Sequence, residues 1–175
     1  MSSSSSSETL AIAVTGTAWM GGGVGSVQSA IEELFDKADC EIQIAVYEMT
    51  AGATKFLNRL RVCLARGIRV TMIINRYEDK PPPIRKRLEF LAKRFPHFEI
   101  LNFQPENEME DLHAKIIIVD RNRALVGSAN LTWKGLVGNH ELAVIVYGPV
   151  ASKIGELFDR LSQDHRITRV LQRIE

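Results

Sequence analysis

Apolar residues along the chain follow two alternating patterns, short apolar runs and longer segments in which apolar positions recur at helical spacing. The runs predict strands at 10–15, 41–48, 68–75, 98–103, 116–119, 124–126 and 142–147. The helical spacing predicts helices at 27–37, 54–66, 84–94 and 150–160, with an extension of the last toward residue 174 left open. Ser26 and Gly67 are typical of helix caps. Because helices and strands alternate, the pattern predicts an α/β fold, a mixed β-sheet sandwiched between helices.

The run 116–119 reads Ile-Ile-Ile-Val and is apolar on both alternating faces. Such a strand is typical of the middle of a sheet that is covered on both sides. His113 and Lys115 stand two residues apart at the start of this strand, so their side chains project to the same face. An ammonium group is seldom buried without a partner, and we interpret the pair as a site for an anion.

Further polar residues follow at the ends of the next apolar strands. The strand 124–126 leads into Gly127, which permits close backbone approach, and then into Ser128 and Asn130, which offer hydrogen-bond donors to phosphate oxygens. Glu141 opens the strand 142–147 and could accept a hydrogen bond from a ring nitrogen of His113, which would fix its tautomer. These are the groups that a phosphodiester-cleaving site requires.

The same residues resemble the signature of the phospholipase D superfamily, which is His-x-Lys-x4-Asp with a downstream Gly-Ser-x-Asn and a later Glu. The matching positions are His113, Lys115, Asp120, Gly127, Ser128, Asn130 and Glu141. The resemblance implies a phospholipase D-like fold in a single domain at 9–175. We expect residues 1–8, which are mostly serine, to be a disordered lead.

In this superfamily two copies of the motif meet at one site, where one His forms a phosphohistidine and the other protonates the leaving oxygen. This chain has one copy, since His97, His140 and His165 have no Lys two positions later. The resemblance therefore implies a homodimer with one His113 from each subunit. It implies that His113, Lys115, Asn130 and Glu141 are catalytic and that no metal or other cofactor is needed. Ser128 and Lys134 are assigned to substrate binding.

Asp120 is interpreted differently, because five residues of strand carry it about 16 Å from Lys115. We predict that it forms a hairpin turn with residues 121–123, where Asp and Asn side chains bond local backbone. Three cations flank the motif: Arg121, Arg123 and Lys134. They could contact a polyanionic substrate or lie on a solvated surface, and both alternatives are left open.

Two aromatic residues have interpretations that depend on the fold. Tyr47 ends the strand 41–48, where a wall of the active-site cleft and core packing are both left open. The glycines of the segment 133–138 predict a loop, in which an exposed Trp133 would be costly. Burial in the core or at a dimer interface is therefore expected, and our hypothesis places Trp133 and Leu136 at the interface that brings two histidines together.

Composition sets bounds on these predictions. The chain of 175 residues is 45% hydrophobic and 25% charged, which is typical of one soluble domain. It contains no apolar run of membrane-spanning length, and its start does not resemble a signal peptide. Cys40 and Cys63 lack metal-ligand spacing and are interpreted as small core residues in a reducing cytoplasm. The formal net charge of +1 does not by itself indicate nucleic-acid binding.

The function expected from the resemblance is a metal-independent phosphodiesterase, foremost a nuclease acting on DNA or RNA. One alternative is a phospholipase acting on cardiolipin-like lipids, for which the sequence offers no membrane-docking helix. A second alternative is a nucleic-acid-binding module that depends on partners within a larger defence or repair complex.

Overall fold

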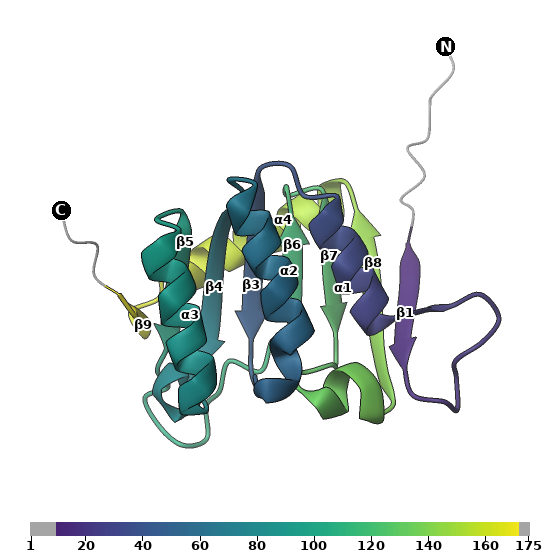
Figure 1. The fold of residues 1–175 in the computed structure, drawn as a ribbon, viewed down its shortest axis with the longest axis horizontal. Helices are drawn as coiled ribbons and strands as arrows, with labels where there is room; N and C mark the ends of the chain where they lie inside the picture. The colour runs from purple at the N-terminus through teal and green to yellow at the C-terminus, as the bar shows by residue number, and fades with distance from the viewer. Residues whose placement is uncertain (1–9, 172–175) are drawn as a thin grey trace, which may run out of the picture.

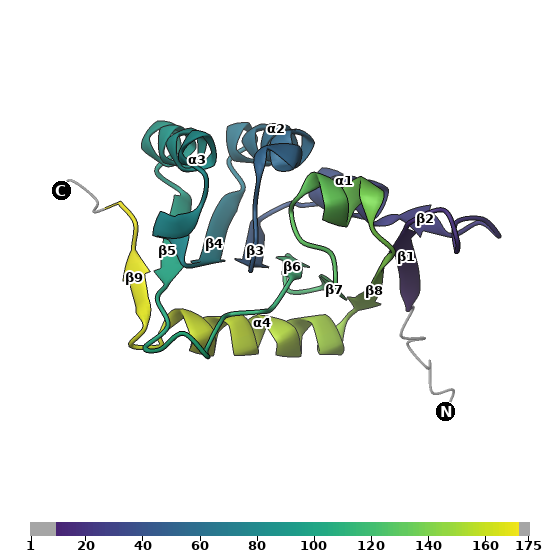
Figure 2. The same ribbon diagram turned by 90° about the horizontal axis from the view of Figure 1, so that it is seen from below.

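The computed structural model describes residues 10–171 of the chain. The lead predicted for residues 1–8 lies outside the described residues. A mixed sheet of nine strands forms the middle layer, and helices cover both of its faces (Figures 1 and 2). The predicted α/β fold class is therefore confirmed.

The sheet has the strand order β2-β1-β8-β7-β6-β3-β4-β5-β9. Strands β3, β4 and β5 run parallel, β2 runs parallel to β1, and the remaining neighbours are antiparallel. The strand bounds are Ala11–Thr15 (β1), Gly25–Ser26 (β2), Glu41–Val46 (β3), Arg69–Asn75 (β4), Phe98–Phe103 (β5), Ile116–Val119 (β6), Arg123–Gly127 (β7), Glu141–Tyr147 (β8) and Ile167–Arg169 (β9).

Four α-helices and three short helical turns complete the layers. Helices α1, α2 and α3 lie on one face of the sheet, whereas α4 crosses the other face (Figure 2). Ser26 accepts a hydrogen bond from the backbone N–H of Ser29 as the α1 N-cap, and Gly67 has the positive φ of 85° expected after α2. The helix bounds are Val27–Asp36 (α1), Thr54–Ala65 (α2), Pro82–Arg94 (α3) and Pro149–Ser162 (α4), with turns Ala51–Ala53 (η1), Tyr77–Asp79 (η2) and Lys134–Gly138 (η3).

Strand β6 lies in the middle of the sheet, as its sequence predicts. Ile117 and Val119 pack into the core beneath α1 and α2, while Ile118 packs into the second core beneath α4. The flanking strand β3 follows the same alternation. Its Ile44 belongs to the first core and its Ala45 to the second. Residues just before β6 are therefore held at the edge of a rigid layer.

The last predicted helix and the last strand differ from expectation. Helix α4 ends at Ser162, and the chain turns back into β9, which pairs with β5. The extension of the helix toward residue 174 is wrong over 163–171, and residues 172–175 lie outside the described part. Asp164 terminates the helix because its carboxylate accepts hydrogen bonds from the backbone and guanidinium of Arg166. Neither β9 nor the short β2 was predicted, since both depend on a partner strand.

The turn between β6 and β7 contains Asp120 and Arg121, whose φ values are 50° and 51°. Positive φ at both central residues is what a type I′ hairpin turn requires. The structural interpretation of Asp120 is confirmed, but its partners are not local. Its carboxylate accepts hydrogen bonds of 2.8–2.9 Å from the backbone N–H groups of Asp39, Cys40 and Glu41. Asp120 therefore joins this hairpin to the start of β3.

Arg121 extends from that turn to a carboxylate on α4. Its guanidinium donates to both carboxylate oxygens of Asp159, at 2.7 and 3.0 Å, and to Glu41 at 2.7 Å. Gln43, which is nearly buried, donates to the same Asp159 at 2.8 Å. These bonds attach α4 to the face of the sheet opposite α1, α2 and α3. They also engage the Arg121 guanidinium with two carboxylates.

Asp159 gives the stability of the protein a predictable pH dependence. The Arg121 guanidinium holds the pKa of the Asp159 carboxyl below its ordinary value. Since the folded-state pKa is the lower one, the stabilisation is present above the unfolded pKa of about 3.9 and is lost as the pH falls below it. We expect Asp159→Asn to lower the melting temperature most near pH 7, with a difference from wild type that shrinks toward pH 3. Circular dichroism melts across this range measure it, and a pH-independent difference would contradict the assignment.

The two cysteines have different environments. Cys63 is buried in α2, as predicted, and burial raises the pKa of its thiol to about 11. Cys40 is exposed, so its assignment to the core is wrong. It stands at the surface because it lies in the connection that Asp120 holds. Within residues 10–171, no helix has the length and apolar character needed to cross a membrane.

Candidate active site

The polar residues singled out from the sequence gather at one edge of the sheet. Parallel strands β3, β4 and β5 end at this edge, which is the lower one in Figure 1. The antiparallel partners β6 and β8 begin there, since Ile116 pairs with Ala45 and Glu141 pairs with Thr15. His113, Lys115, Ser128, Asn130 and Glu141 are thereby brought to the same edge. In open α/β sheets ligands commonly bind outside the carboxyl ends of the strands.

His113 and Lys115 form a contacting pair just before β6. The Lys115 Nζ donates to the His113 carbonyl oxygen at 2.8 Å and lies 3.2 Å from the imidazole Nδ1. His113 is exposed, whereas Lys115 is half-buried. Desolvation lowers the pKa of Lys115 from its ordinary value, and the negative charge of Glu141 opposes the shift. An ammonium with little water around it is suited to contact an anion.

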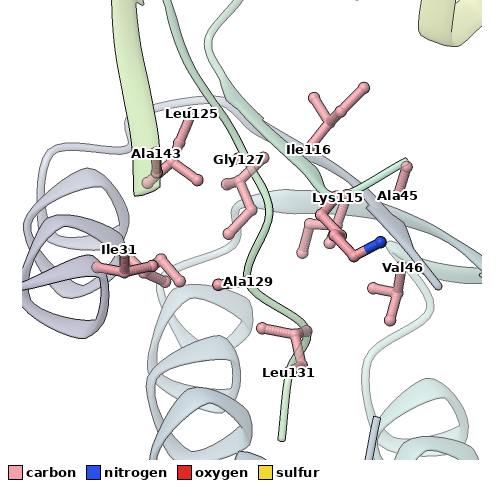
Figure 3. Close-up of a pocket in the computed structure, with 13 residues that line it drawn as sticks. Ile31, Ala45, Val46, Lys115, Ile116, Leu125, Gly127, Ala129, Leu131 and Ala143 are labelled. Carbon is pink, nitrogen blue, oxygen red and sulfur yellow. The ribbon is translucent and has the colours of Figure 1, made fainter. Parts of the chain in front are cut away.

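Figure 3 shows the surroundings of the Lys115 side chain. A small apolar cavity of about 20 Å³ lies between α1 and the sheet, with room for about one water molecule. Among the described residues that line it, Lys115 is the single charged one. Its stem borders the cavity, and its nitrogen points away from Ile31 of α1 (Figure 3). The cavity is too small for a ligand, so an anion would meet Lys115 at the open sheet edge.

The segment before His113 is held by the end of β4. Asn75 is 1% exposed, donates to the Asp111 carboxylate at 2.9 Å and accepts from the Leu112 backbone N–H at 2.9 Å. Arg76 donates to the same Asp111 oxygen and is the main cause that lowers the pKa of that carboxyl. These bonds fix the chain just before the imidazole. The sequence signal for Asn75 was a polar residue closing an apolar strand.

Glu141 binds partners other than the one predicted. Its carboxylate accepts hydrogen bonds from the Ser128 hydroxyl and, at 3.1 Å, from the Asn139 amide. Ser128 also accepts from the backbone N–H of Leu142 at 3.2 Å. Within the described chain no hydrogen bond joins Glu141 to His113, so that prediction is wrong for a single subunit. The reason is that β7 and β8 are neighbours, which places Ser128 against Glu141 and leaves the imidazole, which precedes β6, outside this contact.

Asn130 is placed by two backbone connections. Leu131 donates to the Glu48 carbonyl at 3.0 Å and accepts from the Thr50 N–H at 3.1 Å, which attaches this segment to the end of β3. On its other side, a Cβ added to Gly135 would lie 2.3 Å from the Asn130 carbonyl oxygen. The Asn130 Oδ1 is buried and has no partner within the described chain. The main chain at Asn130 is therefore held closely, and its side-chain amide has hydrogen-bonding capacity to spare.

The segment after Asn130 is not the predicted loop. Lys134–Gly138 forms one π-helical turn, because Leu136 packs into the core and is 5% exposed. The placement of Leu136 at a subunit interface is therefore wrong. Trp133 is 60% exposed, which rules out core packing and leaves the interface as a prediction. Lys134 is exposed near the same edge.

The other candidate cations lie elsewhere. Arg121 and Arg123 belong to the β6–β7 turn at the opposite edge of the sheet, and Arg121 is bound by Asp159 and Glu41. Contact with a substrate bound beside His113 is therefore wrong for Arg121.

The sequence did not indicate two further residues at the site edge, Glu48 and the buried Lys80, which lie beside Tyr47. In the described part of the chain, no group of three or more His, Cys, Asp or Glu side chains could hold a metal ion.

Comparison with solved structures identifies similar folds. Nuc from Salmonella typhimurium, a phospholipase D family member, superposes with a TM-score of 0.74 at 20% identity, covering 94% of this chain and 99% of that one. NucT from Helicobacter pylori gives a TM-score of 0.65 at 16% identity, covering 76% of this chain and 85% of that one. At this level of identity the likeness concerns the fold.

Comparison with protein sequences supplies the family. The DISARM protein DrmC of Bacillus paralicheniformis is 27% identical over 122 residues, which are 69% of this chain and 49% of that protein. The virion nicking-joining enzyme of Vaccinia virus is 27% identical over 112 residues, 63% of this chain and 25% of that protein. The chain thus spans half or less of these relatives. The family model described as "Cardiolipin synthase, PLD-like domain" matches residues 31–162, which is more than half of the chain. The chain belongs to the phospholipase D superfamily.

Proposed function

We propose that this protein is a phosphodiesterase that cleaves nucleic acid through a phosphohistidine at His113, in a site completed by a second subunit. The observation that carries the proposal is the His113–Lys115 pair, in which an exposed imidazole lies 3.2 Å from a partly desolvated ammonium at an open sheet edge. An imidazole is a competent nucleophile near neutral pH, and a fixed cation stabilises charge on phosphate oxygens.

The first chemical step uses both imidazoles. A ring nitrogen of one His113 attacks phosphorus and forms a P–N bond, while the bond from phosphorus to the leaving oxygen breaks. The partner's His113 donates a proton to that leaving oxygen. In the second step this neutral partner imidazole takes a proton from water, whose oxygen attacks phosphorus and releases the first imidazole. The two histidines end in their starting protonation states.

The remaining residues are assigned by their positions. Lys115 and the amide of Asn130 contact the nonbridging oxygens, and Lys134 contacts the substrate backbone from the exposed face of η3. Glu141 acts on Lys115 by charge and holds Ser128 and Asn139 by hydrogen bonds. The Ser128 hydroxyl is engaged by Glu141, and its backbone N–H donates to the Leu142 carbonyl at 3.1 Å, so we assign Ser128 to substrate binding through the shape of the Gly127 turn.

Nucleic acid is favoured as substrate by the similarity of the sequence to that of an enzyme named for nicking and joining. The fold shared with Nuc and NucT is compatible with this substrate. The test is cleavage of labelled single-stranded DNA, double-stranded DNA and RNA in excess EDTA. We expect at least one to be cut. No cleavage of any of the three, or cleavage only after a metal ion is returned, would contradict the proposal.

A lipid phosphodiester is the second candidate, because the description of the matching family model names cardiolipin synthase. Vesicles containing cardiolipin are therefore included as a fourth substrate in the same assay. Release of a lipid headgroup without cleavage of nucleic acid would select this candidate. Binding of nucleic acid without turnover would select the partner-dependent module, for which the similarity to the DISARM protein DrmC is the supporting observation.

The second subunit is proposed to dock on the surface that carries Trp133. Trp133, directly before η3, and Val137 of η3 are 60% and 51% exposed and stand next to the Asn130 segment. Exposed aromatic residues of this kind are typical anchors of protein interfaces. A second subunit bound there would bring the sheet edge that carries its His113 close to the same edge of the first subunit.

Trp133→Ala is expected to weaken the dimer at least about 30-fold, the loss that a central aromatic anchor produces. Sedimentation over a concentration series measures the dissociation constant. Leu157→Ala is the matched control, because Leu157 is 53% exposed on α4, on the other face of the sheet. A Trp133→Ala protein that remains fully dimeric would remove this surface from the proposal.

A further inference from the structure

The Tyr47 ring is the common neighbour of three functional groups at the candidate site. It follows β3 directly and is half-buried. Its centroid lies 4.3 Å from that of the His113 ring and 4.8 Å from the Lys115 Nζ. The Lys80 Nζ lies 5.9 Å from the same centroid. The position of this ring therefore decides where the imidazole and the Lys115 ammonium can rest.

Lys80 is an unusual neighbour, since it is 4% exposed. A buried ammonium requires a partner, and Lys80 has one in Glu48, whose Oε2 accepts from it at 3.2 Å. The other Glu48 oxygen accepts the backbone N–H of Met49 at 3.1 Å. The carboxylate is thus fixed at the end of β3, and the ammonium is fixed by the carboxylate.

The backbone of Lys80 is also held in place. Its N–H donates to the Tyr77 carbonyl at 3.1 Å, and its carbonyl accepts from the Arg85 Nε at 3.2 Å. Tyr77 is fully buried, and Pro81 follows Lys80 directly. Lys80 therefore reaches Tyr47 from a rigid support on the α3 side, whereas His113 and Lys115 approach the ring from the segment before β6.

We propose that Lys80 and Glu48 are positioning residues, which hold the Tyr47 ring against His113 and Lys115. Cations near an aromatic face are attracted to its electrons, so the charge on Lys80 contributes to the placement of the ring. Lys80 itself does not touch substrate. Because a displacement of about 1 Å in a reacting group can cost about 100-fold in rate, the arrangement of the ring matters for turnover. The consequence for cleavage rests on the proposed function, but the consequence for the His113 environment does not.

Lys80→Met removes the charge and keeps the length of the side chain, and Lys80→Arg keeps the charge. Lys93→Met is the matched control, because Lys93 is exposed on α3. The first measurement is the NMR resonance of the His113 ring proton, assigned by its loss in His113→Ala. Ring-current shifts make this resonance sensitive to the position of Tyr47. The second is the kcat and KM for cleavage of a labelled DNA strand.

We expect Lys80→Met to move the His113 resonance and to lower kcat by about 10- to 100-fold with KM nearly unchanged. Lys80→Arg should keep the His113 resonance and kcat close to those of wild type, and Lys93→Met should change neither the resonance nor kcat. A folded Lys80→Met protein with an unmoved resonance and wild-type kcat would overturn the inference and leave the proposed function standing. A moved resonance in a protein that cleaves no phosphodiester would support the positioning role and refute the proposed function.

If Lys80→Met does not fold, Glu48→Gln provides the same test, because it removes the charged partner of Lys80 and keeps the size of the side chain. The His113 resonance should move and kcat should fall, as for Lys80→Met. An unmoved resonance with wild-type kcat would overturn the inference.

Discussion

Replacing His113 by alanine is expected to reduce cleavage by at least about 1,000-fold, because the variant lacks both the nucleophile and the acid. Its melting temperature should change little, since the His113 side chain is exposed. Single-turnover cleavage of the preferred substrate measures the rate. His165→Ala is the control, because His165 is exposed and pairs with Glu106 beside β9, the outermost strand, whereas His113 precedes the central β6. Substantial activity in His113→Ala would refute the proposed nucleophile.

The same variant tests whether two subunits share one site. After wild type and an excess of His113→Ala are unfolded and refolded together, most wild-type subunits are paired with variant subunits. A shared site needs both imidazoles, so the activity should follow the square of the wild-type fraction. A linear dependence would mean that each subunit works alone.

Asp120→Ala is expected to lower the free energy of unfolding by about 2–4 kcal/mol, because three backbone N–H groups lose a charged acceptor. Cleavage per folded molecule should stay close to wild type, since Asp120 lies at the sheet edge opposite His113. Urea unfolding and the single-turnover rate measure the two effects. Asp39→Ala is a matched control, because Asp39 is exposed in the same connection. A stable Asp120→Ala protein without activity would place Asp120 in the chemistry instead.

The sequence allowed the main features of the fold to be predicted. The run 116–119 is apolar at every position, which is typical of a strand covered on both faces. Strand β6 has this environment. Ser26 and Gly67 mark helix ends by local chemistry, which a single sequence contains. The strands β2 and β9 carry no such signal. They exist because β1 and β5 offer unpaired backbone groups to a chain that passes by.

The candidate site was predictable in its motif residues and not in their supports. His113, Lys115, Asn130 and Glu141 stand at strand ends, and the sheet order brings these ends together. Asn75 and Lys80 lie far from the motif along the chain and come close only because β4 ends at the same edge. The bond expected between Glu141 and His113 was wrong for a related reason. The order of the strands, which a single sequence does not reveal, gives Glu141 the neighbour Ser128.

The two shortest strands have a consequence for how copies of this protein meet. Within residues 10–171 the sheet is bounded by β2, with two residues, and by β9, with three, so neither of these outermost strands presents a long row of free backbone groups. Long open edges are where sheets of separate molecules join into extended aggregates. With both sides shortened in this way, joining two sheets into one continuous sheet is disfavoured. Self-association is then directed to side-chain surfaces, where its geometry is selective.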